Sequence, residues 1–333
     1  MKAALARTRR ALAHALEAGA GGPRALAPVY AWLSTRGEIL APPTGTLVVP
    51  VRGATLGGSW KTPVAIAVTR ALHARGVRAG LGMHAYGGSL QDARAVYPED
   101  DVRAVGDEAL VAARSLDPAI PVVAGNRQNA VAALLARDAR ILVLDGHARR
   151  PASSHAAILA LDADAPYGSR ELVPRGDLRA EPRALLRDAR WVLAVHDALR
   201  DSSVSIAGAR SCAFDLVVPP ALARARVAVV TAVARPARFL AALSRRGVRV
   251  VGHVALADHG GPWAHASAAR GLAELSAFDA IVTTEKCATW LPASIDGRPV
   301  VALALSLDIP ATLVNDVIAA AADVRRASTS LLQ

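Results

Sequence analysis

Short apolar segments alternate with helical segments along the chain from residue 46 onward. Helical patterns span, for example, residues 64–75 and 129–137. The apolar segments span 47–51, 77–82, 121–124, 141–145, 158–162 and 191–196. Apolar positions that run continuously, rather than alternating with polar ones, are typical of strands buried on both faces. The pattern therefore predicts an α/β fold with a mostly parallel sheet flanked by helices.

The pattern weakens between residues 200 and 210, and a second series of elements follows. Its expected helices are 236–246 and 266–275, and its expected strands are 227–233, 248–254, 280–283 and 300–305. This series predicts a second, smaller α/β domain. We therefore divide the chain into an N-terminal segment (1–45), a larger domain (46–200) and a smaller C-terminal domain (201–333).

A glycine-rich loop joins the first expected strand to the first expected helix. It ends in Lys61 and Thr62, directly before the helix. Strand, Gly-rich loop, Lys-Thr and helix form the arrangement that binds nucleotide phosphates, through backbone N–H groups, a lysine charge and a hydroxyl for magnesium. The larger domain is therefore predicted to be P-loop NTPase-like and to bind ATP or GTP. The expected phosphate-binding residues are Thr55, Leu56, Gly57, Gly58, Ser59, Trp60, Lys61 and Thr62.

Two positions of this loop depart from the general motif. Trp60 stands where the motif has the glycine before the lysine, and Thr55 stands in place of the first glycine. A glycine there accepts a positive φ, which a tryptophan adopts only at a cost of ~1 kcal/mol or more. On the pattern alone, a Gly-rich turn with a solvated Lys61 stays an alternative.

The charge balance favours an anionic partner. The net charge is +11, and most of the positive charge comes from arginine. Such a balance suits nucleic acid, an acidic membrane surface or a phosphorylated substrate, although a GC-rich genome also enriches arginine. Aromatic residues make up only 4% of the chain, and no recognition motif accompanies the arginines, so no nucleic-acid partner is expected. Cys212 and Cys287 are too few for a disulfide framework and fit a reducing compartment.

The N-terminal segment has a basic, amphipathic pattern. Residues 1–18 carry four basic side chains among alanine and leucine, and 28–33 add two aromatic rings. No apolar run in the chain is long enough for a transmembrane helix. The segment is expected to lie on an anionic membrane surface, and a helix packed on its own domain is the alternative.

Several motifs, in order and at sensible spacings, resemble the tetraacyldisaccharide 4'-kinase family. The loop VRGATLGGSWKTP at 51–63 is similar to the family's V-G-N-x-T-V-G-G-T-G-K-T-P, which also has threonine at the position of Thr55. VGDEA at 105–109 matches in full, and TTEKCA at 283–288 matches T-T-E-K-D-A almost in full. Weaker similarities lie at 83–88, 145–149, 166–182, 235–239 and 256–260.

The resemblance implies a reaction, cofactors and roles. It implies transfer of the γ-phosphoryl group of ATP to the 4'-hydroxyl of a tetraacylated glucosamine disaccharide 1-phosphate, at the cytoplasmic face of the Gram-negative inner membrane. Lys61 and the loop would hold the phosphates, and Thr62 and Asp145 would ligate Mg²⁺. Asp107 matches the family's proposed catalytic base, and His259 matches the histidine that partners it.

Other readings of these residues stay open. Asp107 and Glu108 suit the start of any helix, Asp145 suits a turn, and Glu285 with Lys286 suits a surface ion pair. Asp258 and His259 alone are a weak signal. The family's paired aspartates are reduced to one, Arg149 and His84 replace a histidine and an arginine, and Trp60 replaces a glycine. These departures make a catalytically impaired pseudokinase, acting as a lipid-binding or scaffold protein, the alternative to an active kinase.

Overall fold

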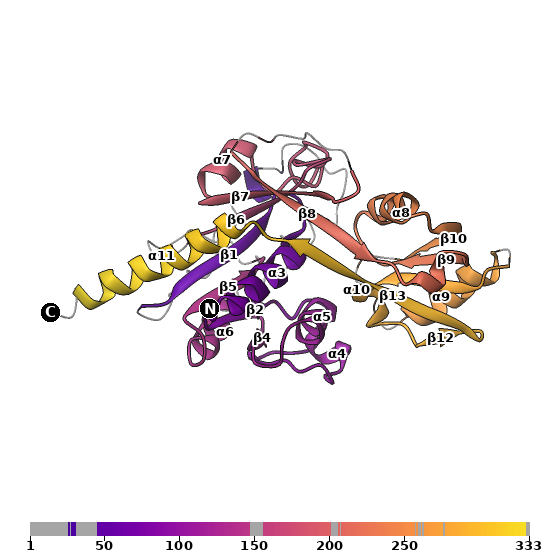
Figure 1. The fold of residues 1–333 in the computed structure, drawn as a ribbon, viewed down its shortest axis with the longest axis horizontal. Coiled ribbons are helices and arrows are strands. Elements are labelled where there is room, and N and C mark those ends of the chain that lie inside the picture. Colours follow the sequence, from indigo (N-terminus) through magenta and orange to yellow (C-terminus); the bar gives the residue numbers. More distant parts are fainter. Residues whose placement is uncertain are drawn as a thin grey trace.

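The computed structural model describes residues 26, 28–30, 45–146, 156–200, 206, 208–256, 258, 261, 263–275 and 277–330. Two lobes are visible in Figure 1, joined by a pair of long strands. We call residues 45–217 with 304–330 the first lobe and residues 218–303 the second lobe. The predictions for 1–18, for Arg149 and for His259 lie outside the described residues. Tyr30, one of the two aromatic residues in 28–33, is described and buried, and the membrane association of this segment stays a prediction.

The sheet of the first lobe has the strand order β8-β7-β6-β1-β5-β2-β4-β3. All of its pairs are parallel except β3 with β4 at the edge. The predicted α/β fold with a mostly parallel sheet is therefore confirmed. The strands are β1 (Leu47–Gly53), β2 (Ala79–Met83), β3 (Arg94–Ala95), β4 (Val122–Ala124), β5 (Ile141–Asp145), β6 (Ile158–Asp162), β7 (Trp191–Asp197) and β8 (Arg210–Val217).

Helix α3 (Lys61–Ala74) packs across the middle of this sheet. Its buried face, which includes Val64, Val68 and Leu72, contacts β1, β2 and β5. Pro63 fits in its first turn, because the first N–H groups of a helix have no intrahelical partner. Between α3 and the second lobe lie the helices α4 (Val102–Val105), α5 (Asp107–Ser115), α6 (Gln128–Leu135) and α7 (Pro182–Arg187).

The second lobe is the predicted smaller α/β unit. Its strands β10, β9, β11 and β13 lie in this order and are parallel, as expected for buried strands separated by helices. The elements are η2 (Pro220–Leu222), β9 (Arg226–Thr231), α8 (Pro236–Arg245), β10 (Arg249–Ala255), α9 (Ala264–Ala273), β11 (Ala280–Thr284), α10 (Glu285–Ala288), β12 (Ser294–Ile295) and β13 (Arg298–Asp308).

Strand β13 makes the two sheets continuous. Its residues 300–303 pair with β11 in the second lobe, and its residues 304–308 pair antiparallel with β8 in the first. The chain therefore leaves and re-enters the first lobe through neighbouring strands (Figure 1). Strand β8 was not predicted from the sequence, because its residues alternate between buried and half-exposed or exposed positions instead of forming a continuous apolar run.

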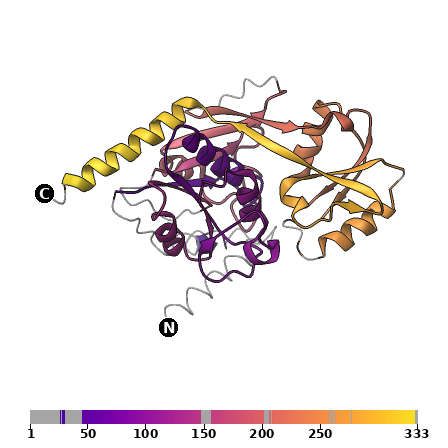
Figure 2. The ribbon, with the colours of Figure 1, turned by 60° about the horizontal axis from the view of Figure 1, so that its bottom comes forward.

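Helix α11 (Ala311–Ser330) returns to the first lobe, where it contacts α3 and β1 (Figure 2). Leu313, Val314 and Val317 are buried in the same apolar cluster as Leu47 and Val64. This helix was also not predicted, and the division of the chain at residues 45 and 200 stays a prediction. Over the residues with described positions, no helix combines the length and the apolar character needed to cross a bilayer.

Candidate active site

The predicted phosphate-binding loop leaves β1 at Gly53 and enters α3 at Lys61. It lies at the carboxyl end of the sheet, where α/β proteins bind their ligands. The loop folds tightly over the end of β1, because a Cβ on Gly53 would lie only 1.9 Å from the Ser59 hydroxyl. A side chain at Gly53 is therefore incompatible with this path of the loop.

Trp60 has a left-handed backbone conformation, which glycine accepts more readily than any other residue. Its φ of 65° and ψ of 5° are left-handed, and it is the residue that precedes the first turn of α3. The indole is 7% exposed, and its centroid lies 4.6 Å from that of Phe214 on β8. The guanidinium of Arg238 on α8 lies 4.4 Å from the same ring centroid. The large side chain is thus packed in the core between β8 and the second lobe.

Thr62 and Asp145 lie side by side although 83 residues separate them. The two strands that lead to them, β1 and β5, are neighbours, and their register pairs Val51 with Asp145. The Thr62 hydroxyl donates a hydrogen bond of 2.6 Å to Asp145 Oδ2. The Lys61 ammonium is also close. A Cβ built on Gly146, the residue after Asp145, would lie 3.7 Å from Lys61 Nζ. The structure therefore brings three of the predicted site residues together.

Asp145 is a carboxylate with spare bonding capacity in a buried position. It is 4% exposed, and among the described residues its Oδ1 has no hydrogen-bond partner. Burial raises the pKa of Asp145, while the Lys61 charge and the Thr62 hydrogen bond act in the opposite direction. A buried oxygen left free in this way is a candidate ligand for a hard cation.

Asp107 begins α5, and its position depends on the glycine before it. Gly106 has φ 86° and ψ 156°, a conformation almost confined to glycine. A Cβ at Gly106 would also lie 2.4 Å from the Tyr86 carbonyl oxygen. Asp107 is 1% exposed, and its Oδ1 accepts a hydrogen bond from the Glu108 N–H. Asp107 is therefore both a helix-start carboxylate and a buried charge at the boundary between the lobes.

Lys286 is a member of this group that the sequence analysis did not assign. Its Nζ lies 3.1 Å from Asp258 Oδ1 in its own lobe and 3.7 Å from Glu108 Oε1 in the first lobe. Burial alone would lower the pKa of Lys286, but Glu108, Asp107 and Asp258 together raise it. The surface ion pair with Glu285 was wrong, since Glu285 accepts a hydrogen bond from the Leu305 N–H instead. The TTEK motif, which ends β11 and begins α10, was the signal for Lys286.

Three arginines, one in the first lobe and two in the second, donate hydrogen bonds to oxygen atoms of the loop. Arg179 donates to the carbonyl oxygens of Thr55 and Leu56. From the start of α8, Arg235 donates to the Thr55 hydroxyl at 3.3 Å, and Arg238 donates to the Gly58 carbonyl oxygen at 2.5 Å. These arginines lie in the segments 166–182 and 235–239, which are similar to the family, but no role was predicted for them. The apex of the loop is therefore fixed by contacts with both lobes.

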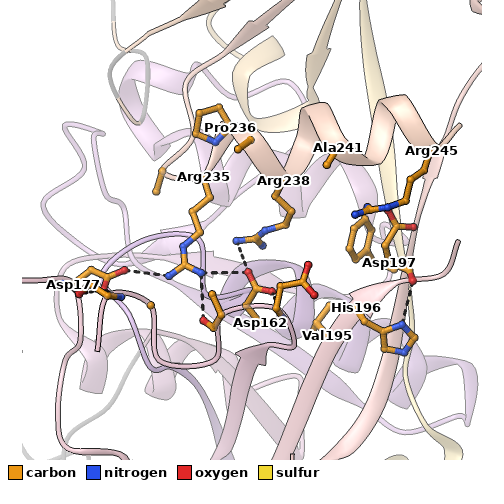
Figure 3. A pocket seen from close by; sticks show the side chains of 17 residues that line it. Asp162, Asp177, Val195, His196, Asp197, Arg235, Pro236, Arg238, Ala241 and Arg245 are labelled. Atoms are coloured by element: carbon orange, nitrogen blue, oxygen red, sulfur yellow. Dashed lines mark hydrogen bonds and ion pairs between the residues drawn. The ribbon is translucent and has the colours of Figure 1, made fainter. Parts of the chain in front are cut away.

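Arg235 and Arg238 also line a cavity of about 600 Å³ at the lobe boundary. Figure 3 shows both side chains projecting from the start of α8 toward Asp162 and Asp177. Asp162 Oδ2 lies 3.2 Å from Arg235 and 3.1 Å from Arg238. Burial lowers the pKa of Arg238 to about 10, and the opposing effect of Asp162 is smaller.

Comparisons with known proteins agree on one family. The profile of the family described as tetraacyldisaccharide-1-P 4'-kinase (LpxK) matches residues 24–322. A tetraacyldisaccharide 4'-kinase of Anaeromyxobacter sp. (strain Fw109-5) is 36% identical over 283 residues, covering 74% of this chain and 74% of the relative. Its counterpart from Rhodospirillum rubrum is 33% identical over 291 residues, covering 81% and 84%.

A solved structure shares the fold. The crystal structure of LpxK from Aquifex aeolicus in complex with ATP superposes with a TM-score of 0.61 at 16% sequence identity. The match covers 95% of this chain and 99% of that chain. Both lobes therefore belong to the shared architecture.

Proposed function

The chain belongs to the tetraacyldisaccharide 4'-kinase family, and from this membership we propose that it transfers the γ-phosphoryl group of ATP to the 4'-hydroxyl of tetraacyldisaccharide 1-phosphate. The observation that carries the proposal is the Lys61–Thr62–Asp145 group at the start of α3. A lysine, a hydroxyl and a carboxylate at the end of a glycine-rich loop are the parts that phosphoryl transfer requires.

The residues present fit a magnesium–nucleotide complex. Within the described part of the chain, Asp145 Oδ1 and the Ser59 hydroxyl are buried oxygen atoms without a hydrogen-bond partner. Thr62 and Asp145 would hold Mg²⁺ through oxygen ligands, and Lys61 with the loop 55–62 would hold the phosphates. When bound, the metal supplies positive charge that offsets the negative charge of the phosphates.

The remaining charged residues suit proton transfer and orientation. Asp107 is the proposed acceptor of the hydroxyl proton, with His259 as its proposed partner. The Lys286 ammonium attracts Asp107, Glu108 and Asp258, so it stabilises these carboxylates where the two lobes meet. Holding the groups in place before reaction is the main contribution a protein makes to this chemistry.

The acceptor is a lipid, so we place the protein at the cytoplasmic face of the Gram-negative inner membrane. The net charge of +11 supports attraction to an anionic surface. The basic segment 1–45 is the part proposed to lie on that surface, as a peripheral or monotopic anchor. No nucleic-acid partner is proposed.

The test is phosphate transfer from labelled ATP to tetraacyldisaccharide 1-phosphate in detergent micelles, with and without Mg²⁺. Lys61→Ala is the control for the loop. We expect transfer that requires Mg²⁺ and is lost in the variant. Well-folded protein that transfers no phosphate would replace this proposal with the pseudokinase, and Mg-ATP binding by calorimetry would then show whether the nucleotide site is retained.

A further inference from the structure

We propose that Arg238 is a positioning residue for the phosphate-binding loop, and that it compensates for the tryptophan at position 60. This inference rests on the proposed function, because it assigns a task within the nucleotide site. It concerns the pairing of two residues from different lobes, Trp60 in the loop and Arg238 on α8.

The left-handed backbone at Trp60 needs support from the surrounding structure. A non-glycine residue with φ 65° is strained, and such a conformation persists only where packing over-determines it. For Trp60 the support is the ring contact with Phe214 and the guanidinium of Arg238. A relaxed backbone at this residue would change the direction in which α3 begins, and with it the position of Lys61.

Arg238 fixes the loop at two points at once. It lies over the Trp60 ring and donates to the carbonyl oxygen of Gly58, two residues earlier. The bond to Gly58 matters because that residue also has a positive φ, of 64°. Asp162, at the end of β6, holds the same guanidinium nitrogen at 3.1 Å. The arginine is therefore oriented by one lobe while it is carried by the other.

The contact makes the loop dependent on the second lobe. Phe214 belongs to β8, but Arg238 belongs to α8, which follows β9. With α8 in place, Arg238 covers the Trp60 ring and donates a hydrogen bond to the Gly58 carbonyl oxygen. Replacing Arg238 removes both contacts together. Arg238 thus acts on the nucleotide through the loop.

The first experiment compares Arg238→Met with Arg245→Met. Both residues lie on α8 and line the same cavity, but Arg245 pairs with Asp197 and is not among the residues that hold the loop. We expect Arg238→Met to raise the Kd for Mg-ATP about tenfold, with an equal rise in the KM for ATP and little change in the KM for the lipid. Arg245→Met should leave the Kd for Mg-ATP and the KM for ATP unchanged. Arg238→Lys keeps the charge but not the planar guanidinium group, and its Kd should lie between those of wild type and Arg238→Met.

The second experiment asks whether Trp60 is the reason for the effect. Trp60→Gly removes the backbone strain, so Arg238→Met should matter less in that background: about threefold or less in Kd instead of about tenfold. The inference would be overturned if Arg238→Met raised the Kd by the same factor in the Trp60→Gly background as in wild type. If Trp60→Gly does not fold, Trp60→Asn serves instead, because asparagine also visits the left-handed region.

A third measurement does not depend on the reaction. Hydrogen exchange of the backbone amides in residues 54–62 should become faster in Arg238→Met and stay unchanged in Arg245→Met. Wild-type protein that neither binds Mg-ATP nor transfers phosphate would remove the proposed function, and the exchange comparison would still decide whether Arg238 orders the loop. Equal exchange in wild type and Arg238→Met would refute the positioning role even if the kinase is active.

Discussion

The ammonium group of Lys286 lies 3.7 Å from the carboxylate of Glu108, and these two residues belong to different lobes. Glu108 follows Asp107 at the start of α5, and Lys286 lies in α10 directly after β11. The charges proposed for catalysis therefore meet only when the lobes are joined. Geometry at this boundary, more than the loop alone, determines whether the site is complete.

Replacing Lys286 with methionine keeps most of the side-chain volume but removes its charge. Glu108 and Asp258 then lose the positive charge of Lys286, which should cost about 2 kcal/mol of unfolding free energy. Turnover should fall at least tenfold. Urea unfolding and the transfer assay measure the two effects, and Lys286→Arg should recover part of both. Unchanged turnover in Lys286→Met would contradict a role at the site.

Lys61→Ala and Asp107→Ala should each reduce turnover by about a hundredfold or more, because each removes a charge that the transition state requires. The fold should remain, as judged by circular dichroism. Glu99→Ala is the control, since Glu99 is an exposed carboxylate of the same lobe. Wild-type rates in either variant would refute the assigned role.

Asp145→Asn should separate stability from activity. Asparagine keeps the shape and an acceptor for Thr62, but not the charge. Because burial raises the pKa of Asp145 in the folded state, its ionised form disfavours folding at neutral pH, and the variant should have a higher Tm. Its turnover should fall, and the Mg²⁺ concentration needed for half-maximal rate should rise. Melting and Mg²⁺ titration test this; a lower Tm with normal Mg²⁺ dependence would exclude it.

Asp197 should make the junction of the lobes sensitive to acid. Burial alone would raise the pKa of Asp197, but hydrogen bonds from Arg246, the Leu199 N–H and Arg245 together hold it below its ordinary value. Its stabilising effect is thus fully present above the unfolded value of about 3.9 and is lost as the pH falls through the lower, folded value.

Asp197→Ala removes the carboxylate that pairs with Arg245 and one of the two that pair with Arg246, so it should cost about 3 kcal/mol at pH 7. The difference from wild type should shrink as the pH drops below about 4. Denaturant unfolding at both pH values measures this. A difference that stays constant would show that the carboxylate acts by packing and not by charge.

Gly106→Ala should displace Asp107. The alanine would meet the Tyr86 carbonyl oxygen and would also have to adopt a backbone conformation that is nearly confined to glycine, at a cost of about 1–3 kcal/mol. We expect a lower Tm together with a turnover loss larger than that of a matched Gly76→Ala change, because Gly76 has open space around it. Equal turnover in the two variants would argue against this account.

Parts of the fold could be predicted because they follow local rules. Strands β5 and β6 have the predicted bounds, since their apolar runs are continuous. Strand β8 alternates, so its pattern carries less signal. Helix α11 has its buried residues at helical spacing, including Leu313, Val317 and Ala320, and this signal was present but not used.

The residues of the candidate site also fall into two groups, those that local sequence rules predict and those that depend on the docking of the lobes. Lys61, Thr62 and Asp145 approach one another because neighbouring parallel strands deliver them to one edge of the sheet. The pairing of Lys286 with Glu108, and of Arg238 with Trp60, depends on how the lobes dock. No local pattern encodes that docking, so these pairs could be found only in the structure.

The return of α11 to the first lobe has a consequence for biosynthesis. Leu313 and Val314 complete a core that also contains Leu47 from β1 and Val64 from α3. A ribosome must therefore translate the whole second lobe before the first can close its hydrophobic core. Folding of the nascent chain cannot proceed strictly from the N-terminal end, and apolar surface on α3 and β1 stays exposed until α11 emerges. Until then, that surface is where a chaperone would be expected to bind.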